Sequence, residues 1–76
     1  MKAYVLINIH TGELRHVVHQ LKRIEQVKEA TMTFGPYDAV VTVEASDVNE
    51  LGRILAMDIQ PIPGVEQTLT CLAVDI

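Results

Sequence analysis

Several groups of side chains in this 76-residue chain have the types and spacing that could support chemistry. The first is the turn Phe34-Gly35-Pro36-Tyr37-Asp38. In such a turn Gly supplies φ freedom, Pro fixes φ and removes a donor, and Asp can bond to nearby backbone. The backbone N–H groups that it leaves free can hold a small polar ligand. Most turns of this kind, however, only connect two strands, so a plain hairpin connection is the alternative.

The three histidines raise the question of a metal site. His16 and His19 are three residues apart on a predicted helix, one turn after Glu13, and could meet one ion. Together with His10 they fall on the face predicted to be exposed, where nothing excludes water or fixes the ligands, and no cysteine has suitable spacing. We therefore predict exposed histidines, with no metal ion and no cofactor.

Cys71 is the single cysteine, so it can form no internal disulfide, and this fits a reducing compartment. It lies in a predicted strand without a nearby base in the sequence, so we expect a buried structural thiol rather than a nucleophile. Gly-rich phosphate motifs and the G-x-S-x-G elbow are absent, which leaves no positive evidence for an enzyme. Thr68 and Thr70 remain as candidate polar groups, although Thr70 alone is also an ordinary strand residue.

Composition narrows the class of protein further. The length allows a single domain over residues 1–76, and 49% of the chain is apolar, which is rich for a small monomer and indicates a buried interface. The formal net charge is −4 and the basic residues are scattered, so we expect no direct binding to nucleic acid. No stretch is long enough to span a membrane and the start lacks the pattern of a signal peptide, so we predict a cytoplasmic protein.

The elements that must position these groups follow from the hydrophobic period. Strands are predicted over residues 3–9, 27–34, 37–44 and 66–74. Helices are predicted between an N-cap at Thr11 and about Gln26, and between an N-cap at Ser46 or Asp47 and a stop at Pro61. The apolar stripe of the second helix consists of Val48, Leu51, Leu55 and Ile59. Gly52 falls on the same face, and a close approach of this helix to the sheet would compensate for the cost of a glycine within a helix.

The order of these elements repeats strand–helix–strand twice. It predicts an α+β, ferredoxin-like βαββαβ fold, in which a four-stranded antiparallel sheet carries two helices on one face. The first strand is apolar on both sides, because Val5 and Ile7 point one way while Tyr4 and Leu6 point the other. The helices can cover only one side of the sheet. We therefore predict a C₂ dimer through the other sheet face, which is the arrangement of a dimeric α+β barrel.

Three runs of residues together indicate a known family. They are Phe34-Gly35-Pro36-Tyr37-Asp38 before an apolar strand, Asp47 before a helix that carries Leu51, and Ile62-Pro63-Gly64-Val65 leading to Thr68-Leu69-Thr70. Over essentially its whole length the chain resembles the effector-binding half, or RAM domain, of the Lrp/AsnC transcriptional regulators of amino-acid metabolism. The resemblance implies the ferredoxin-like fold, dimers through the sheet face, and further assembly into rings such as octamers.

The resemblance also implies a ligand site between neighbouring dimers, where a small molecule, usually an amino acid, binds. Carried over by position, Gly35 lets the backbone approach the α-carboxylate of the ligand. Tyr37 and Asp38 shape the pocket, with Asp38 a candidate partner for the α-ammonium. Thr68 and Thr70 add hydroxyl groups from the last strand.

One departure from the family concerns DNA. Full-length members carry an N-terminal helix-turn-helix, whereas this chain starts with the first sheet strand. We therefore expect a stand-alone sensor module that does not bind DNA by itself but can join full-length Lrp/AsnC regulators. Two alternatives stay open: a ligand-independent oligomerisation partner of such regulators, and a small dimeric α+β barrel enzyme, for which His10 would have to face an interior cavity. An ACT-type amino-acid sensor shares the topology but fits the turn at Gly35 less well.

Overall fold

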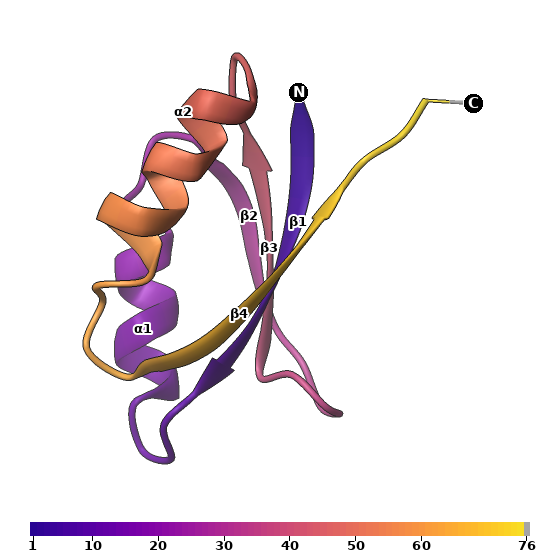
Figure 1. Cartoon of the computed structure of the whole chain (residues 1–76). Coiled ribbons are helices and arrows are strands. Elements are labelled where there is room, and N and C mark those ends of the chain that lie inside the picture. Colours follow the sequence, from indigo (N-terminus) through magenta and orange to yellow (C-terminus); the bar gives the residue numbers. More distant parts are fainter. Residues whose placement is uncertain (76) are drawn as a thin grey trace.

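The computed structural model describes residues 1–75. Its elements are β1 (Lys2–Ile9), α1 (Leu14–Leu21), β2 (Val27–Met32), β3 (Ala39–Glu44), α2 (Val48–Arg53), a π-helix that continues α2 (Ile54–Ile59), and β4 (Val65–Leu72). The strands form one sheet in the order β2-β3-β1-β4, with every neighbouring pair antiparallel. Both helices lie on the same side of this sheet (Figure 1). The predicted ferredoxin-like α+β fold is confirmed.

The hydrophobic core lies between the helices and one face of the sheet. Along β1, side chains alternate between the two faces, so Val5 and Ile7 are fully buried, opposite Val41 and Ala39 of β3. The helices contribute the buried residues Val17, Val18, Leu21, Leu51, Ile54 and Ile59. Among the described residues no buried position is polar or charged. No helix within residues 1–75 combines the length and hydropathy needed to cross a membrane.

Helix α1 is shorter than predicted. The predicted N-cap, Thr11, is wrong, because Gly12 adopts a positive φ of 91° and the helix starts only after Glu13. At the other end, the N–H of Ile24 donates to the carbonyl of Leu21, a three-residue spacing that tightens the chain into a turn. The helix therefore ends at residue 21 rather than near residue 26.

The start of α2 confirms the predicted cap. The carboxylate of Asp47 accepts a bond from the N–H of Glu50 at 2.8 Å, and Glu50 accepts in return from the N–H of Ser46 at 2.7 Å. This reciprocal pair is a capping box that reaches one residue further back than usual. It fixes the direction in which the chain leaves β3.

The predicted apolar stripe of the second helix is partly wrong. Val48 is exposed, and a side chain at Gly52 would meet nothing within 4 Å, so no close approach occurs there. The later part of the stripe is altered by the π-helix, in which the N–H of Gln60 donates to the carbonyl five residues earlier. Ile54 and Ile59 are both fully buried, although five residues on an α-helix would place them about 140° apart. The wider π-turn brings them onto one face.

The close backbone approach occurs at Gly64 instead. A Cβ atom there would lie 2.8 Å from Glu13 Cβ and 2.9 Å from Val17 Cγ2. Gly64 also has a positive φ of 105°, and its carbonyl accepts from the N–H of His10 at 2.7 Å. This crossing of the loop before β4 over the start of α1 requires a residue without a side chain.

Candidate functional site

The turn between β2 and β3 is a fixed structure. The N–H of Thr33 donates to the carbonyl of Asp38 at 3.0 Å, and the Thr33 hydroxyl donates to the carbonyl of Tyr37 at 2.7 Å. These bonds close the turn, so β2 ends two residues earlier and β3 begins two residues later than predicted. Gly35, at the tip, has a φ of 133° and open space where a Cβ would be. The backbone at the tip is therefore accessible to a ligand.

The turn is also attached to the end of β1. Ile9 N–H donates to Asp38 Oδ2 at 2.7 Å, and Asn8 Nδ2 donates to the carbonyl of Pro36 at 2.8 Å. The half-buried carboxylate of Asp38 thus bonds to backbone in this copy, while a carboxylate retains lone pairs for a second donor. Asn8 was not predicted as part of this site. Its only signal in the sequence is one amide in an otherwise apolar strand.

Replacing Asp38 tests how much its bond to the end of β1 stabilises the fold. Asp38→Ala leaves the N–H of Ile9 without its acceptor, and we expect the free energy of unfolding to fall by about 1–3 kcal/mol. Asp38→Asn keeps an acceptor oxygen and should lose less than half of that. Urea denaturation followed by circular dichroism measures the difference. Equal stability of Asp38→Ala and the wild-type chain would contradict the structural role.

Phe34, next to Gly35, is fully exposed. The turn that carries it projects on the side of the sheet away from the helices (Figure 1). An aromatic ring held in water by a rigid turn forgoes the roughly 1.5–3 kcal/mol that its burial would contribute. The ring of Phe34 is therefore available for a contact at the turn.

Thr68 and Thr70 lie in the edge strand β4, opposite Ile7 and Val5, and therefore on the face that carries the helices. The Thr68 hydroxyl oxygen accepts from Gln60 Nε2 at 3.2 Å, so the hydroxyl proton stays available to donate to a ligand. A depression of about 180 Å³ lies beside Thr68 and is lined by Gln60, Val65, Glu66, Gln67 and Thr68. Gln60 was missed because its contact with Thr68 depends on how the π-helix ends.

One copy of the chain does not bring the turn and the two threonines together. Ile7 pairs with Ala39 on one side and with Thr68 on the other. Thr68 is therefore separated from the start of β3 by two strand spacings, roughly 10 Å. Gly35, Tyr37 and Asp38 form one candidate group, and Thr68 with Thr70 forms another.

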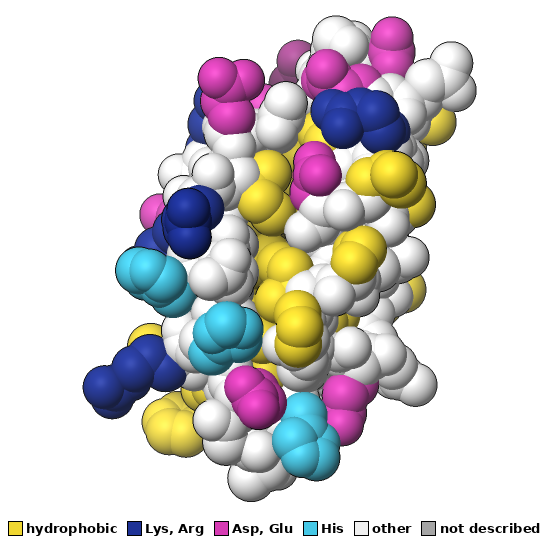
Figure 2. Space-filling model, turned by 90° about the vertical axis from the view of Figure 1, so that its left-hand side faces the viewer, with side chains coloured by type: hydrophobic (Ala, Val, Ile, Leu, Met, Phe, Trp, Pro, Cys, Tyr) yellow, Lys and Arg dark blue, Asp and Glu magenta, His cyan; other side chains and the backbone are white. Residues whose placement is uncertain are grey.

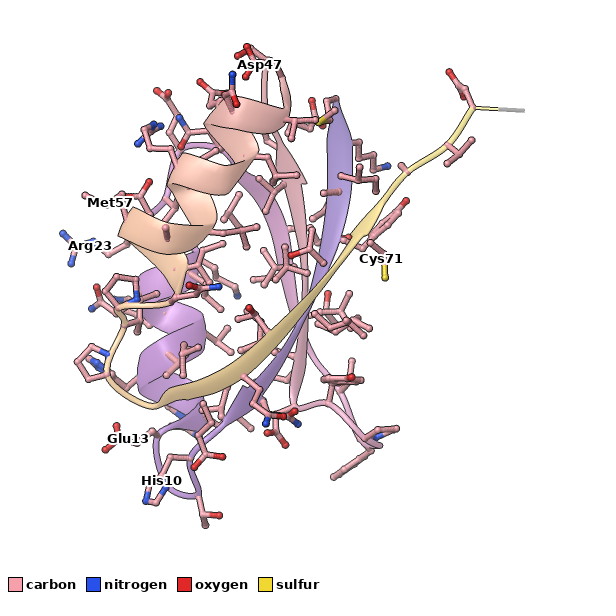
Figure 3. All side chains as sticks on the ribbon, viewed as in Figure 1. His10, Glu13, Arg23, Asp47, Met57 and Cys71 are labelled. Atoms are coloured by element: carbon pink, nitrogen blue, oxygen red, sulfur yellow. The ribbon has the colours of Figure 1, made fainter. Side chains whose placement is uncertain are left out.

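The remaining chemical candidates lie apart from both groups. Within residues 1–75 no cluster of His, Cys, Asp and Glu has the geometry to hold a metal ion. His10 Nδ1 lies 3.2 Å from Glu66 Oε2 in an exposed pair, near Glu13 at one end of the molecule (Figure 3). Cys71 was expected to be buried, but it is exposed, because its pairing with Tyr4 places it on the face without helices (Figure 3).

The sheet has an uncovered apolar surface, which we call the open face. Leu6 lies at its centre, between Val40 of β3 and Leu69 of β4. The open face consists of Tyr4, Leu6, Val40, Leu69 and Cys71. In the described chain both helices lie on the opposite side of the sheet, so these side chains are partly or largely exposed. The open face is therefore available for contact with another surface.

The helix side has a different character. Hydrophobic side chains line the seam between the two helices, and side chains of both charges are scattered around it (Figure 2). No single sign of charge dominates this side, unlike the basic surface that binding to a phosphate backbone requires.

Taken together, these features define a small ferredoxin-like domain with an uncovered apolar sheet face and an exposed turn. The model of the Lrp/AsnC ligand binding domain matches residues 2–76. The chain is 36% identical over 72 residues to the HTH-type transcriptional regulator FL11 of Pyrococcus abyssi, covering 95% of this chain and 47% of that protein. The chain belongs to the Lrp/AsnC ligand-binding domain family, which confirms the resemblance found in its sequence.

Two further relatives show where such domains occur. The crystal structure of TTHA0845 from Thermus thermophilus superposes with a TM-score of 0.93 at 33% identity, covering 99% of this chain and 94% of that one. A homocitrate synthase of Sulfurisphaera tokodaii is 45% identical over 56 residues, which are 74% of this chain and 12% of the enzyme. The chain spans about half the length of the FL11 regulators that it matches.

Proposed function

We propose that this chain is a regulatory module that binds an amino acid and acts through its assembly with other copies. Membership of the ligand-binding domain family over residues 2–76 carries this proposal. A regulator from Neisseria meningitidis, with a TM-score of 0.89 at 13% identity, is described as a complex with L-Met, which supports an amino acid as the class of ligand. Similar segments occur in transcriptional regulators and in an enzyme. A role that suits both classes of protein is the sensing of a ligand, whereas DNA binding suits only the regulators.

The proposed pocket is shared between copies. Gly35, Tyr37 and Asp38 of one copy would meet Thr68 and Thr70 of another, because the two groups lie too far apart within one chain. The two ends of an amino acid suit the two kinds of group. Free N–H groups at the turn and the Thr68 hydroxyl can donate to a carboxylate, and the Asp38 carboxylate can accept from an ammonium group.

Dimerisation through the open face is part of the same proposal. Burying Leu6, Val40 and Leu69 against a second copy removes apolar surface from water at about 25 cal/mol per Å². A second copy supplies a matching surface through a two-fold axis. In this proposal the module has no catalytic role and no DNA contact of its own, acts inside the cell, and changes the response of full-length Lrp/AsnC regulators that it joins.

Isothermal titration calorimetry against the twenty amino acids, one at a time, tests the ligand. We expect heat from one or a few of them, and loss of that heat in Thr68→Val, which keeps the shape of the side chain but removes the hydroxyl. Thr11→Val, at an exposed threonine of the loop between β1 and α1 that lies outside the proposed pocket, is the matched control and should bind normally.

Absence of heat with every amino acid would sink the sensor function. If the chain nevertheless co-purified with a full-length Lrp/AsnC regulator, it would be a ligand-independent assembly partner. Light scattering that shows a stable monomer would contradict the assembly proposal.

A further inference from the structure

The two edges of the sheet differ in how they are protected against pairing. Edge strand β2 has six residues, includes Lys28 and Glu29, and carries a register irregularity between Val27 and Glu29. Charges and bulges of this kind keep an edge from pairing with another chain. Edge strand β4 has eight residues and a single charged side chain, Glu66, next to its start. The β4 edge therefore lacks the usual protection.

The hydrogen bonds of β1 decide which backbone groups of β4 are free. The N–H of Ala73 donates to the carbonyl of Lys2, and the N–H of Ala45 donates to the carbonyl of Met1 on the other side of β1. In an antiparallel ladder the bonding direction alternates from one residue to the next. Gln67, Leu69 and Cys71 therefore direct their N–H and C=O groups toward β1.

The intervening residues of β4 direct theirs away from the sheet. Thr68, Thr70 and Leu72 thus present a row of N–H and C=O groups that β1 does not use. Apolar side chains accompany this row, since Leu69, Leu72 and Val74 are about half exposed or more. An edge with free backbone groups and apolar side chains is a template for another strand.

We propose that β4 pairs with β4 of a second copy, antiparallel and centred on Thr70. In this register Thr70 lies opposite the partner's Thr70, and Thr68 lies opposite the partner's Leu72. Each of these pairs exchanges two hydrogen bonds, and a Thr–Thr cross-strand pair is favourable. Glu66 lies opposite the partner's Val74, so no two like charges face each other. The contact is distinct from the open face and joins two sheets into one.

The pairing has a consequence for the proposed ligand pocket, and this part rests on the proposed function. The depression of about 180 Å³ is lined by Thr68 and other residues of the edge strand β4, close to where the partner's Leu72 would lie. The second copy would then supply one wall of the pocket. Ligand binding and edge pairing would favour each other.

Hydrogen exchange of the assembled wild-type protein tests the pairing directly. A free edge gives an alternating pattern, with slow exchange at residues 67, 69 and 71 and fast exchange at 68, 70 and 72. We expect this alternation to disappear in the assembled protein, because the partner protects the outward amides, and to return on dilution. Alternation that persists in the assembled protein would overturn the proposal.

The substitution Thr70→Pro provides a second test of the β4 pairing. Thr70→Pro removes only the outward N–H and suits an edge strand, so the fold should survive, as circular dichroism can verify. We expect light scattering to show the assembled mass reduced to that of the open-face dimer. Thr70→Val keeps the N–H and should retain the full mass. Loss of the calorimetric heat of ligand binding in Thr70→Val, without loss of mass, would show that the hydroxyl contributes to the pocket and not to the pairing.

The opposite edge supplies the matched control. Ala30 of β2 directs its N–H away from the sheet by the same alternation, so Ala30→Pro should leave the mass unchanged. The same loss of mass in Ala30→Pro would place β2 in the contact and overturn pairing between two β4 strands. If Thr70→Pro fails to fold, the exchange pattern of the wild-type protein decides.

Discussion

Gly64→Ala is expected to be the most damaging single-methyl substitution among the glycines of this chain. The added Cβ would lie under 3 Å from both Glu13 Cβ and Val17 Cγ2, neither of which is the far end of a flexible side chain. The positive φ of 105° adds backbone strain for any residue with a side chain. We expect the free energy of unfolding to fall by about 3 kcal/mol and the melting temperature by roughly 15 °C.

The other glycines provide graded controls for this measurement. Gly52→Ala adds a methyl group in open space on a helix and should stabilise the fold by about 1 kcal/mol. Gly35→Ala also meets open space but has a φ of 133°, so it should destabilise by about 1 kcal/mol. Thermal melting of the three variants gives the order directly. If Gly64→Ala melts close to Gly35→Ala, the crossing of the loop over α1 is not tight.

The second large effect is expected on assembly. Leu6→Lys places a charge at the centre of the open face, between Val40 and Leu69. A lysine there remains solvated in the isolated subunit but would be buried without a partner in a face-to-face dimer, which costs several kcal/mol. We expect the mass measured by light scattering at micromolar concentration to fall to at most that of a dimer, which is the assembly that β4 pairing alone can hold.

A matched substitution on the other side of the molecule controls for the added charge. Met57 is largely exposed on the helix side and points away from the sheet (Figure 3). Met57→Lys therefore adds the same charge without touching the open face and should leave the mass unchanged. An assembled mass in Leu6→Lys equal to that of the wild-type protein would show that the open face is not an interface.

The architecture could be predicted from the sequence because it depends on alternation within single strands. Val5 and Ile7 on one side of β1, with Tyr4 and Leu6 on the other, are visible in the order of residues alone. The cap at Asp47 was equally visible, because a capping box is local in sequence. These features need no knowledge of which elements become neighbours in space.

The errors have the opposite character. The tight glycine is Gly64 rather than Gly52, because tightness depends on which loop crosses which helix. Gln60 was overlooked since its bond to Thr68 joins the end of a helix to a strand. Asp38 is not among these errors: the structure adds a bond that its carboxylate accepts from the N–H of Ile9, and its role toward a ligand stays a prediction. The five predicted ligand residues stay a prediction, since their convergence requires a second chain.

The π-helix Ile54–Ile59 bears on how this chain should be compared with others of its family. A π-turn holds one residue more than an α-turn, and short π-segments arise as single-residue bulges in α-helices. A relative that lacks one residue between positions 55 and 58 could therefore form an uninterrupted α-helix and still deliver the following loop to its strand. In a multiple alignment, single-residue gaps should concentrate in this segment, and numbering across the family should shift by one there.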